Sequence, residues 1–206
     1  MFNVNKIGDL ETATTAFGQG VSVTPLQQIT AVSAAINGGI LYKPYIVKSI
    51  NEPETNSIIK QNNPNIVRKV ISEETSEKVR YALESVVSLG TGHNAYIEGY
   101  RIGGKTGTAQ KVENGKYMVG NYITSFIGFL PADKPEAVVY IAIDNAKGVT
   151  QYGGTIAAPI AKEVMKDIIN ALDIKKRKDG IKKEYTYLDV KKYEVENVVG
   201  LNKKKQ

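Results

Sequence analysis

Two hundred and six residues, of which 42% are hydrophobic and 23% charged, suffice for one domain of ordinary size with a packed core. The chain has no cysteine and one histidine, which excludes disulfides and thiolate metal sites and argues against zinc, so we expect no metal and no cofactor. The formal net charge of +6 lies mostly at the end of the chain: residues 173–206 hold 11 basic and 6 acidic side chains, against 16 and 15 in the remainder. A nearly neutral body gives no support for a nucleic-acid partner.

The first residues show no basic patch followed by an apolar run, and no window approaches the ~18 apolar residues that span a bilayer. We therefore expect neither a signal peptide nor a transmembrane segment in this chain. The composition turns lysine-rich after Leu172. This change divides the chain into an expected folded part, residues 1–172, and a basic linker or tail, residues 173–206.

The first predicted helix covers residues 25–36, because Thr24 is a good N-cap residue and apolar residues follow at helical spacing. Residues 40–50 are β-branched and aromatic and predict a strand, which Pro44 places at a sheet edge or a bend. Two shorter strands are expected at residues 58–60 and 66–71.

Ser72 is expected to cap a second helix, which ends before Gly90. Three strands should follow, at residues 100–112, 121–130 and 137–144. The Asn114-Gly115 pair between the first two is a strong hairpin signal and predicts an antiparallel meander. A last amphipathic helix is expected over residues 156–172. The predicted fold class is α+β, an antiparallel sheet flanked by helices.

The segment most suggestive of chemistry is G-G-K-T-G-T at residues 103–108. Together with Gly99 it fits the phosphate-loop pattern G-x-x-x-x-G-K-[ST], and an apolar strand ending in Asp144 could supply a magnesium ligand. A phosphate loop needs a helix that begins at its Lys-Thr pair, however, and no helical apolar pattern follows Thr106. A nucleotide-binding protein is therefore the weaker alternative.

The same residues fit a K-T-G motif on a strand, as in penicillin-interacting serine enzymes. Lys105 supplies a positive charge that attracts a substrate carboxylate and favours proton transfer at a nearby nucleophile, and Thr106 offers its hydroxyl to that carboxylate. Gly107 has no side chain, which lets a substrate lie along the strand. The N–H of Thr108 can point at a developing oxyanion, and Gln110 follows on the same strand face. We expect Lys105 and Thr108 as catalytic residues, and Thr106, Gly107, Thr108 and Gln110 as substrate-binding residues.

Several blocks of the chain carry a family likeness. They are residues 17–27 (FGQGVSVTPLQ), 35–39 (AINGG), 42–45 (YKPY), 84–87 (ESVV), 90–92 (GTG), 103–110 (GGKTGTAQ), 125–129 (SFIGF), 131–132 (PA) and 144–145 (DN). In this order they resemble the class B penicillin-binding transpeptidases, and among them the sporulation-specific members of endospore-forming bacteria. The likeness spans nearly all of residues 7–172. It implies the C-terminal portion of the β-lactamase/transpeptidase-like fold. It also implies D,D-transpeptidation of peptidoglycan stem peptides ending in D-Ala-D-Ala, through a serine acyl-enzyme that β-lactams also form.

The resemblance also implies two motifs ahead of K-T-G: S-x-x-K, which carries the nucleophile, and then S-x-N. The letters occur at Ser57 to Lys60 and at Ser49 to Asn51, but in the wrong order, and Ser57 follows a turn instead of opening a helix. We interpret both as chance matches. The chain is thus expected to be the C-terminal half of a transpeptidase domain, inactive alone, with the upstream half as its partner. The alternative from another class is a non-catalytic binding or assembly fragment.

Three further expectations concern His93, the end of the chain and the location of the parent protein. His93 has no evident metal or triad partner, so we interpret it as a solvated loop residue and not as a general base. Residues 193–201 resemble the opening strand of a PASTA module, a small wall-binding domain, of which only the start would be present. The family resemblance implies a parent protein anchored in the membrane, with its catalytic domain outside the cytoplasmic membrane.

Overall fold

The computed structural model of the chain describes residues 7–16 and 18–179. The elements are α1 (Asp9–Ala16), α2 (Pro25–Ile36), β1 (Ile40–Lys43), β2 (Ser49–Asn51), β3 (Ile58–Gln61), β4 (Asn65–Lys69), α3 (Glu73–Ser88), the 3-10 helix η2 (His93–Ala95), β5 (Gly103–Glu113), β6 (Lys116–Leu130), β7 (Ala137–Asp144) and α4 (Gly153–Ala171). Helices beside antiparallel strands confirm the predicted α+β class. Within these two ranges, no helix has the length and apolarity needed to cross a bilayer.

The central sheet is antiparallel, with its strands in the order β5-β6-β7. Between β5 and β6 the chain turns at Asn114 and Gly115, whose φ angles of 50° and 76° lie in the left-handed region that these residues adopt most easily. The predicted hairpin and meander are confirmed. β6 begins at Lys116, earlier than the predicted residue 121, because the hairpin pairs almost to its tip.

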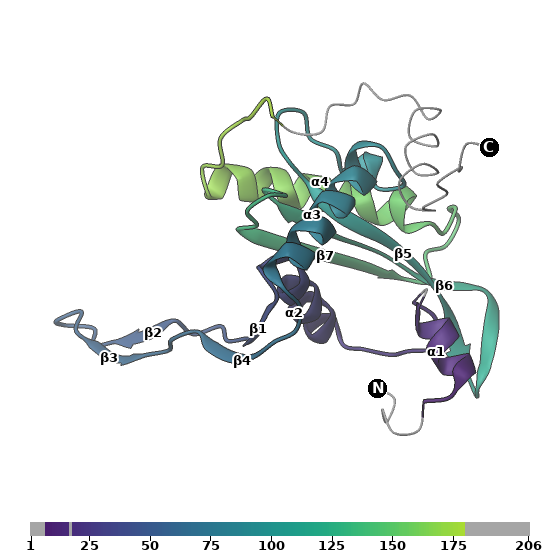
Figure 1. The fold of residues 1–206 in the computed structure, drawn as a ribbon, viewed down its shortest axis with the longest axis horizontal. Helices are drawn as coiled ribbons and strands as arrows, with labels where there is room; N and C mark the ends of the chain where they lie inside the picture. Colours follow the sequence, from purple (N-terminus) through teal and green to yellow (C-terminus); the bar gives the residue numbers. More distant parts are fainter. Residues whose placement is uncertain (1–6, 17, 180–206) are drawn as a thin grey trace, which may run out of the picture.

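Different helices cover the two faces of this sheet (Figure 1). On one face, Phe126 and Leu130 of β6 belong to a core that α4 closes. On the opposite face, Phe129 packs with Ile36 of α2 and with Leu83 of α3. Because side chains alternate along β6, the strand contributes to two separate cores, one on each side of the sheet.

The first two long helices begin where the sequence predicts. Thr24 caps α2 in a capping box, in which its hydroxyl accepts from the Gln27 N–H while the Gln27 side chain accepts from the Thr24 N–H. Ser72 caps α3 by accepting a hydrogen bond from the Thr75 N–H. Both contacts satisfy backbone donors that a helix start leaves without intrahelical partners.

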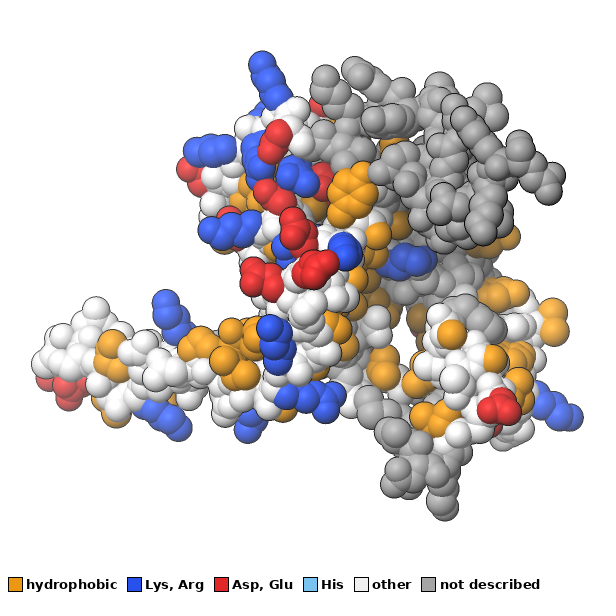
Figure 2. All heavy atoms as spheres, viewed as in Figure 1, with side chains coloured by type: hydrophobic (Ala, Val, Ile, Leu, Met, Phe, Trp, Pro, Cys, Tyr) orange, Lys and Arg blue, Asp and Glu red, His pale blue; other side chains and the backbone are white. Residues whose placement is uncertain are grey.

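Residues 40–69 form an arm that extends from the body (Figure 1). β1 pairs with β4 and β2 pairs with β3, as two short antiparallel ribbons. The prediction of one strand over residues 40–50 is wrong, because the chain leaves the strand conformation from Pro44 until β2 starts. The arm is exposed along most of its length, and hydrophobic and basic side chains interleave on it (Figure 2). Such a ribbon has little buried surface of its own to stabilise it.

Two ends of the described chain differ in how they contact the body. α1 is absent from the predictions, and none of its residues is buried, so it lacks the apolar face from which a helix is recognised. After α4, Ile174 packs against the core and the Arg177 N–H donates to the Gly99 carbonyl oxygen. The predicted start of a PASTA module, residues 193–201, lies outside the described residues.

Candidate active site on strand β5

The K-T-G residues lie in the first half of β5, which is an edge strand of the sheet. Two phenyl rings explain the glycines that precede them. A Cβ on Gly103 would lie 2.2 Å from the Phe129 ring, and a Cβ on Gly104 would lie 2.5 Å from the Phe126 ring. Glycine at both positions lets the aromatic side chains of the two cores press directly against the strand, which holds the motif on a rigid base.

Lys105 and Gly107 border a cavity of about 270 Å³ between the sheet, α2 and α3. Apolar side chains from α2, α3 and β6 line much of the cavity, and its polar lining residues, besides Lys105 and Thr106, are Gln28, Ser125 and Tyr140. Lys105 is exposed, and its Nζ donates to the Thr106 carbonyl oxygen at 3.0 Å. The ion pairs between described residues do not involve it. Its charge is therefore free to meet an anionic ligand at the rim.

Thr106, Thr108 and Gln110 alternate onto the other strand face, toward the start of α4. The Thr106 and Thr91 hydroxyl oxygens are 3.1 Å apart. The Thr108 hydroxyl oxygen accepts from the N–H of Gly153 at 3.4 Å. Gln110 donates across the hairpin to the Met118 carbonyl oxygen at 3.2 Å. The cavity beside Lys105 includes Thr106 but neither Thr108 nor Gln110 among its lining residues.

The backbone of Thr108 points to the open edge of the sheet. Its carbonyl oxygen accepts from the Gln19 side chain at 3.3 Å, and Gln19 belongs to the segment before α2 and not to β6. In an antiparallel strand, the N–H and C=O of one residue point to the same side. The Thr108 N–H should therefore also point away from β6, toward the side on which a ligand can approach.

The phosphate-loop alternative lacks its structural context. Lys105 and Thr106 continue β5, so no helix begins at them, and the neighbouring strands are antiparallel. The proposed magnesium ligand Asp144 is instead paired with Lys111, whose Nζ lies 2.7 and 3.0 Å from its two oxygens. In the described part of the chain, no group of three or more His, Cys, Asp or Glu residues is arranged to hold a metal ion.

The chance motifs also lie apart from the K-T-G strand. Ser57 precedes β3 on the arm and Lys60 lies within that strand, so the two are not one turn apart on a helix. The Ser49 to Asn51 stretch is β2. His93 is exposed, and its Nδ1 lies 3.2 Å from the Gly90 carbonyl oxygen. These positions agree with the interpretation of both motifs as chance matches and of His93 as a solvent-exposed residue.

Sequence reasoning missed three residues that contact the motif: Gln19, Thr91 and Gly153. All three lie outside β5, and although Gln19 and Thr91 belong to the family blocks at residues 17–27 and 90–92, those blocks do not predict which residues of β5 they contact. Gly153 is the tightest of them, since a Cβ there would lie 2.1 Å from the Ser125 carbonyl oxygen and 2.5 Å from that of Gly107. The start of α4 thus rests directly on the backbone of the K-T-G glycine.

Comparison with known proteins agrees with this geometry. Residues 2–166 match the family model "Penicillin binding protein transpeptidase domain". The chain is 58% identical over 202 residues to "Stage V sporulation protein D" of Bacillus subtilis (strain 168), covering 98% of this chain and 31% of that protein. It is 34% identical over 173 residues to "Peptidoglycan D,D-transpeptidase FtsI homolog" of Mesostigma viride, covering 78% of this chain and 29% of that one. The chain spans about a third of the length of these curated relatives.

Solved structures give the same result. Penicillin-binding protein 3 from Mycobacterium tuberculosis, determined with ampicillin, has a TM-score of 0.75 and 28% identity, covering 90% of this chain and 44% of that one. The transpeptidase domain of Burkholderia pseudomallei penicillin-binding protein 3 has a TM-score of 0.69 and 32% identity, covering 84% and 50%. The predicted resemblance to class B penicillin-binding transpeptidases is confirmed, and so is the predicted likeness to their sporulation-specific members. The chain belongs to the penicillin-binding protein transpeptidase domain family.

Proposed function

We propose that this chain supplies the K-T-G strand of a peptidoglycan D,D-transpeptidase. The observation that carries the proposal is the position of Lys105, Thr106 and Gly107 on an edge strand beside a cavity, in a chain of this family. Lys105 attracts the C-terminal carboxylate of a stem peptide ending in D-Ala-D-Ala, and the Thr106 hydroxyl donates to it. Gly107 leaves room for the peptide along the edge of β5, and Gln110 serves as a further substrate-binding residue.

The reaction needs a serine nucleophile, which we place in an upstream segment of the parent protein. The serine oxygen bonds to the carbonyl carbon of the penultimate D-Ala, and the terminal D-Ala leaves with a proton on its amine. The amine of a second stem peptide then attacks the ester carbon, the bond to the serine oxygen breaks, and a proton from the attacking amine passes to the serine oxygen, which leaves the cross-link and a free serine. The N–H of Thr108 stabilises the oxyanion in both steps. β-Lactams acylate the same serine.

The upstream half of the domain is the partner that this assignment requires. β7 has one edge without a strand partner among the described residues, and Ile123 and Leu26 are exposed at 38% and 58%. If the upstream half covered Ile123 and Leu26, it would bury their apolar surface, which is favourable. We place residues 1–172 in the transpeptidase domain, 173–206 in a basic tail, and the domain of the parent protein outside the cytoplasmic membrane.

Labelling with a fluorescent penicillin tests the proposal. The chain alone should remain unlabelled, whereas the complete domain, or the chain mixed with its upstream half, should be labelled. In the complete domain, Lys105→Ala should slow labelling by about 100-fold. The matched control is Lys116→Ala, in the exposed tip of the hairpin, which should leave the rate unchanged. A complete domain that takes up no label, or a chain that is acylated alone, would contradict the proposal.

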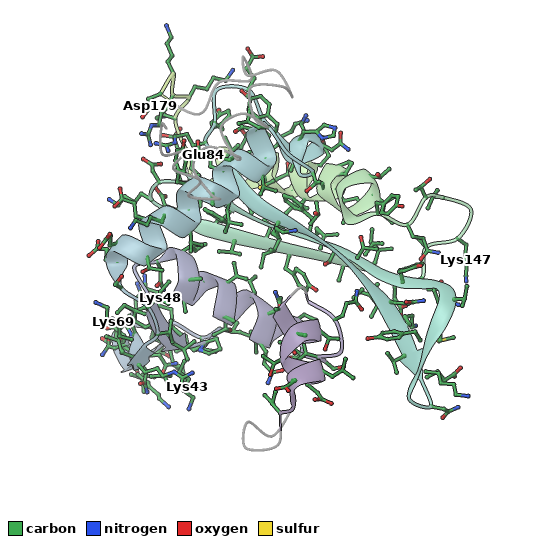
Figure 3. The ribbon with its side chains drawn as sticks, turned by 45° about the vertical axis from the view of Figure 1, so that its right-hand side comes forward. Lys43, Lys48, Lys69, Glu84, Lys147 and Asp179 are labelled. Carbon is green, nitrogen blue, oxygen red and sulfur yellow. The ribbon has the colours of Figure 1, made fainter. Side chains whose placement is uncertain are left out.

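The alternative of a non-catalytic assembly fragment is favoured by one observation, the exposed arm of residues 40–69. Lys43, Lys48 and Lys69 lie on it (Figure 3), and Ile46 is 100% exposed. A surface of this kind suits a protein partner with acidic and apolar groups. This alternative would be favoured over the catalytic one if the chain bound the upstream half stoichiometrically and penicillin failed to label the resulting complex.

A further inference from the structure

Thr91 lies beside the K-T-G threonine although 15 positions separate the two along the chain. It belongs to the loop between α3 and η2, and its Oγ1 is 3.1 Å from the Oγ1 of Thr106. Thr91 is exposed and Thr106 is half-buried, so the pair lies at the surface where a ligand of β5 would bind. Thr106 therefore has a side-chain partner that the motif itself does not specify.

The loop that carries Thr91 is held firmly on both sides. The N–H groups of Gly90 and Gly92 both donate to the Val86 carbonyl oxygen, at 3.2 and 3.0 Å. A Cβ on Gly92 would lie 3.2 Å from the Phe126 ring, so the loop packs against the core. Thr91 is thereby fixed from the side of α3.

The start of α4 closes the loop from the other side. A Cβ on Gly154 would lie 2.4 Å from the Thr91 carbonyl oxygen, and the Asn94 side chain donates to the Gly154 carbonyl oxygen at 2.8 Å. These contacts leave Thr91 little freedom to move away from Thr106. The hydroxyl pair is therefore set by the packing of three elements, α3, α4 and β5.

A hydroxyl carries one proton and two acceptor lone pairs, so only one of two bonded hydroxyls donates. If Thr91 donates, the proton of Thr106 stays available for an incoming carboxylate. We propose that Thr91 is a positioning residue, whose hydroxyl donates to Thr106 and directs the Thr106 proton at the carboxylate of the substrate or of a β-lactam. This inference rests on the proposed function. Thr91 itself acts through Thr106 and needs no contact with the reacting atoms.

The test uses the complete transpeptidase domain and two forms of one fluorescent penicillin, the free acid and its carboxyl methyl ester. Thr91→Val keeps the branched shape of the side chain and removes the hydroxyl, and it should slow acylation by the acid about three- to tenfold. Acylation by the ester should be unchanged, since the ester carries no carboxylate to receive the Thr106 proton. Thr91→Ser restores a hydroxyl and should restore the rate with the acid.

Thermal unfolding of each variant separates positioning from folding, and Thr91→Ala serves if the valine variant does not fold. The inference is overturned if the valine variant reacts with the acid as fast as the wild type. It is also overturned if acid and ester slow equally, or if serine fails to rescue, because those results indicate a purely structural role. If the wild-type domain reacts with neither compound, the proposed function is contradicted, and the inference that rests on it is contradicted as well.

Discussion

The guanidinium of Arg101 holds the buried carboxylate of Glu84 through two hydrogen bonds, from Nε at 2.9 Å and from Nη2 at 2.6 Å. Glu84 is 2% exposed, so Arg101 supplies the opposite charge that offsets the cost of burying its side chain. Glu84 comes from α3 and Arg101 from the segment before β5, and the pair thus ties the helix to the start of the K-T-G strand. The hydrogen bonds that Arg101 donates to Glu84 raise the pKa of Arg101 above its ordinary value, although burial opposes the shift.

The pair continues into a network that reaches the segment after α4. Arg101 Nη1 lies 3.4 Å from Asp133 and 3.8 Å from Asp179. Arg177 bonds both of these carboxylates, and Figure 3 shows Glu84 and Asp179 on the same side of the molecule. The network therefore joins α3, the segment before β5, the turn between β6 and β7, and the residues that follow α4.

The Arg101→Met variant should lose about 3 kcal/mol of unfolding free energy, because it leaves the buried Glu84 carboxylate without its partner. Denaturant unfolding of the chain measures the loss. The matched control is Lys78→Met, which breaks the exposed pair between Lys78 and Glu74 on the same helix and should cost less than about 0.5 kcal/mol. Equal effects of the two variants would show that burial of Glu84 does not decide the cost.

Acid should weaken the part of the network that Asp133 contributes. Burial alone would raise the pKa of Asp133, but the hydrogen bond from Arg177 and the nearby arginines hold it below its ordinary value of 3.8. A lowered pKa in the folded state gives stability above pH 3.8 that is lost as pH falls through the folded-state value. Wild type should therefore exceed Asp133→Asn in unfolding free energy at neutral pH, and the difference should shrink below pH 3.8. A difference that stays constant down to pH 2 would contradict the assignment.

The contact of α4 with the K-T-G strand predicts a strong effect of one methyl group. In Gly153→Ala the new Cβ would meet two backbone carbonyl oxygens that cannot yield, those of Ser125 and Gly107. Displacement of the helix start should destabilise the chain by about 2 kcal/mol and reduce penicillin labelling of the complete domain. Thr155→Ala, at an exposed position in the same helical turn, should change neither. Normal melting of the Gly153→Ala chain, together with normal labelling of the complete domain that carries the same substitution, would refute the contact.

Nucleotide should not stabilise the chain. The K-T residues continue a strand, and Asp144 is engaged by Lys111, so neither a helix start nor a free carboxylate is available for Mg-ATP. We expect no shift of the melting temperature with ATP and magnesium at millimolar concentrations. A saturable upward shift, abolished by Lys105→Ala, would restore the phosphate-loop interpretation.

The sequence was sufficient wherever the interacting groups are neighbours in the chain. Thr24 and Ser72 cap helices by bonding to N–H groups three residues away, and the turn at Asn114 and Gly115 follows from the conformations these two residues adopt. The family motif could be recognised because it is contiguous. The arm was predicted less well, because the pairing of β1 with β4 joins segments more than twenty residues apart.

Thus the sequence by itself determined the α+β class, most of the elements and the chemistry expected of Lys105, Thr106 and Gly107. Only the tertiary structure decided what surrounds them: the cavity beside Lys105, the contact of Gly153 with the strand, and the hydroxyl of Thr91 at Thr106. The physical reason is the separation along the chain between the groups that interact. Caps and turns follow from backbone hydrogen bonds within a few residues, whereas the surroundings of the site depend on how distant helices pack against the two faces of one sheet.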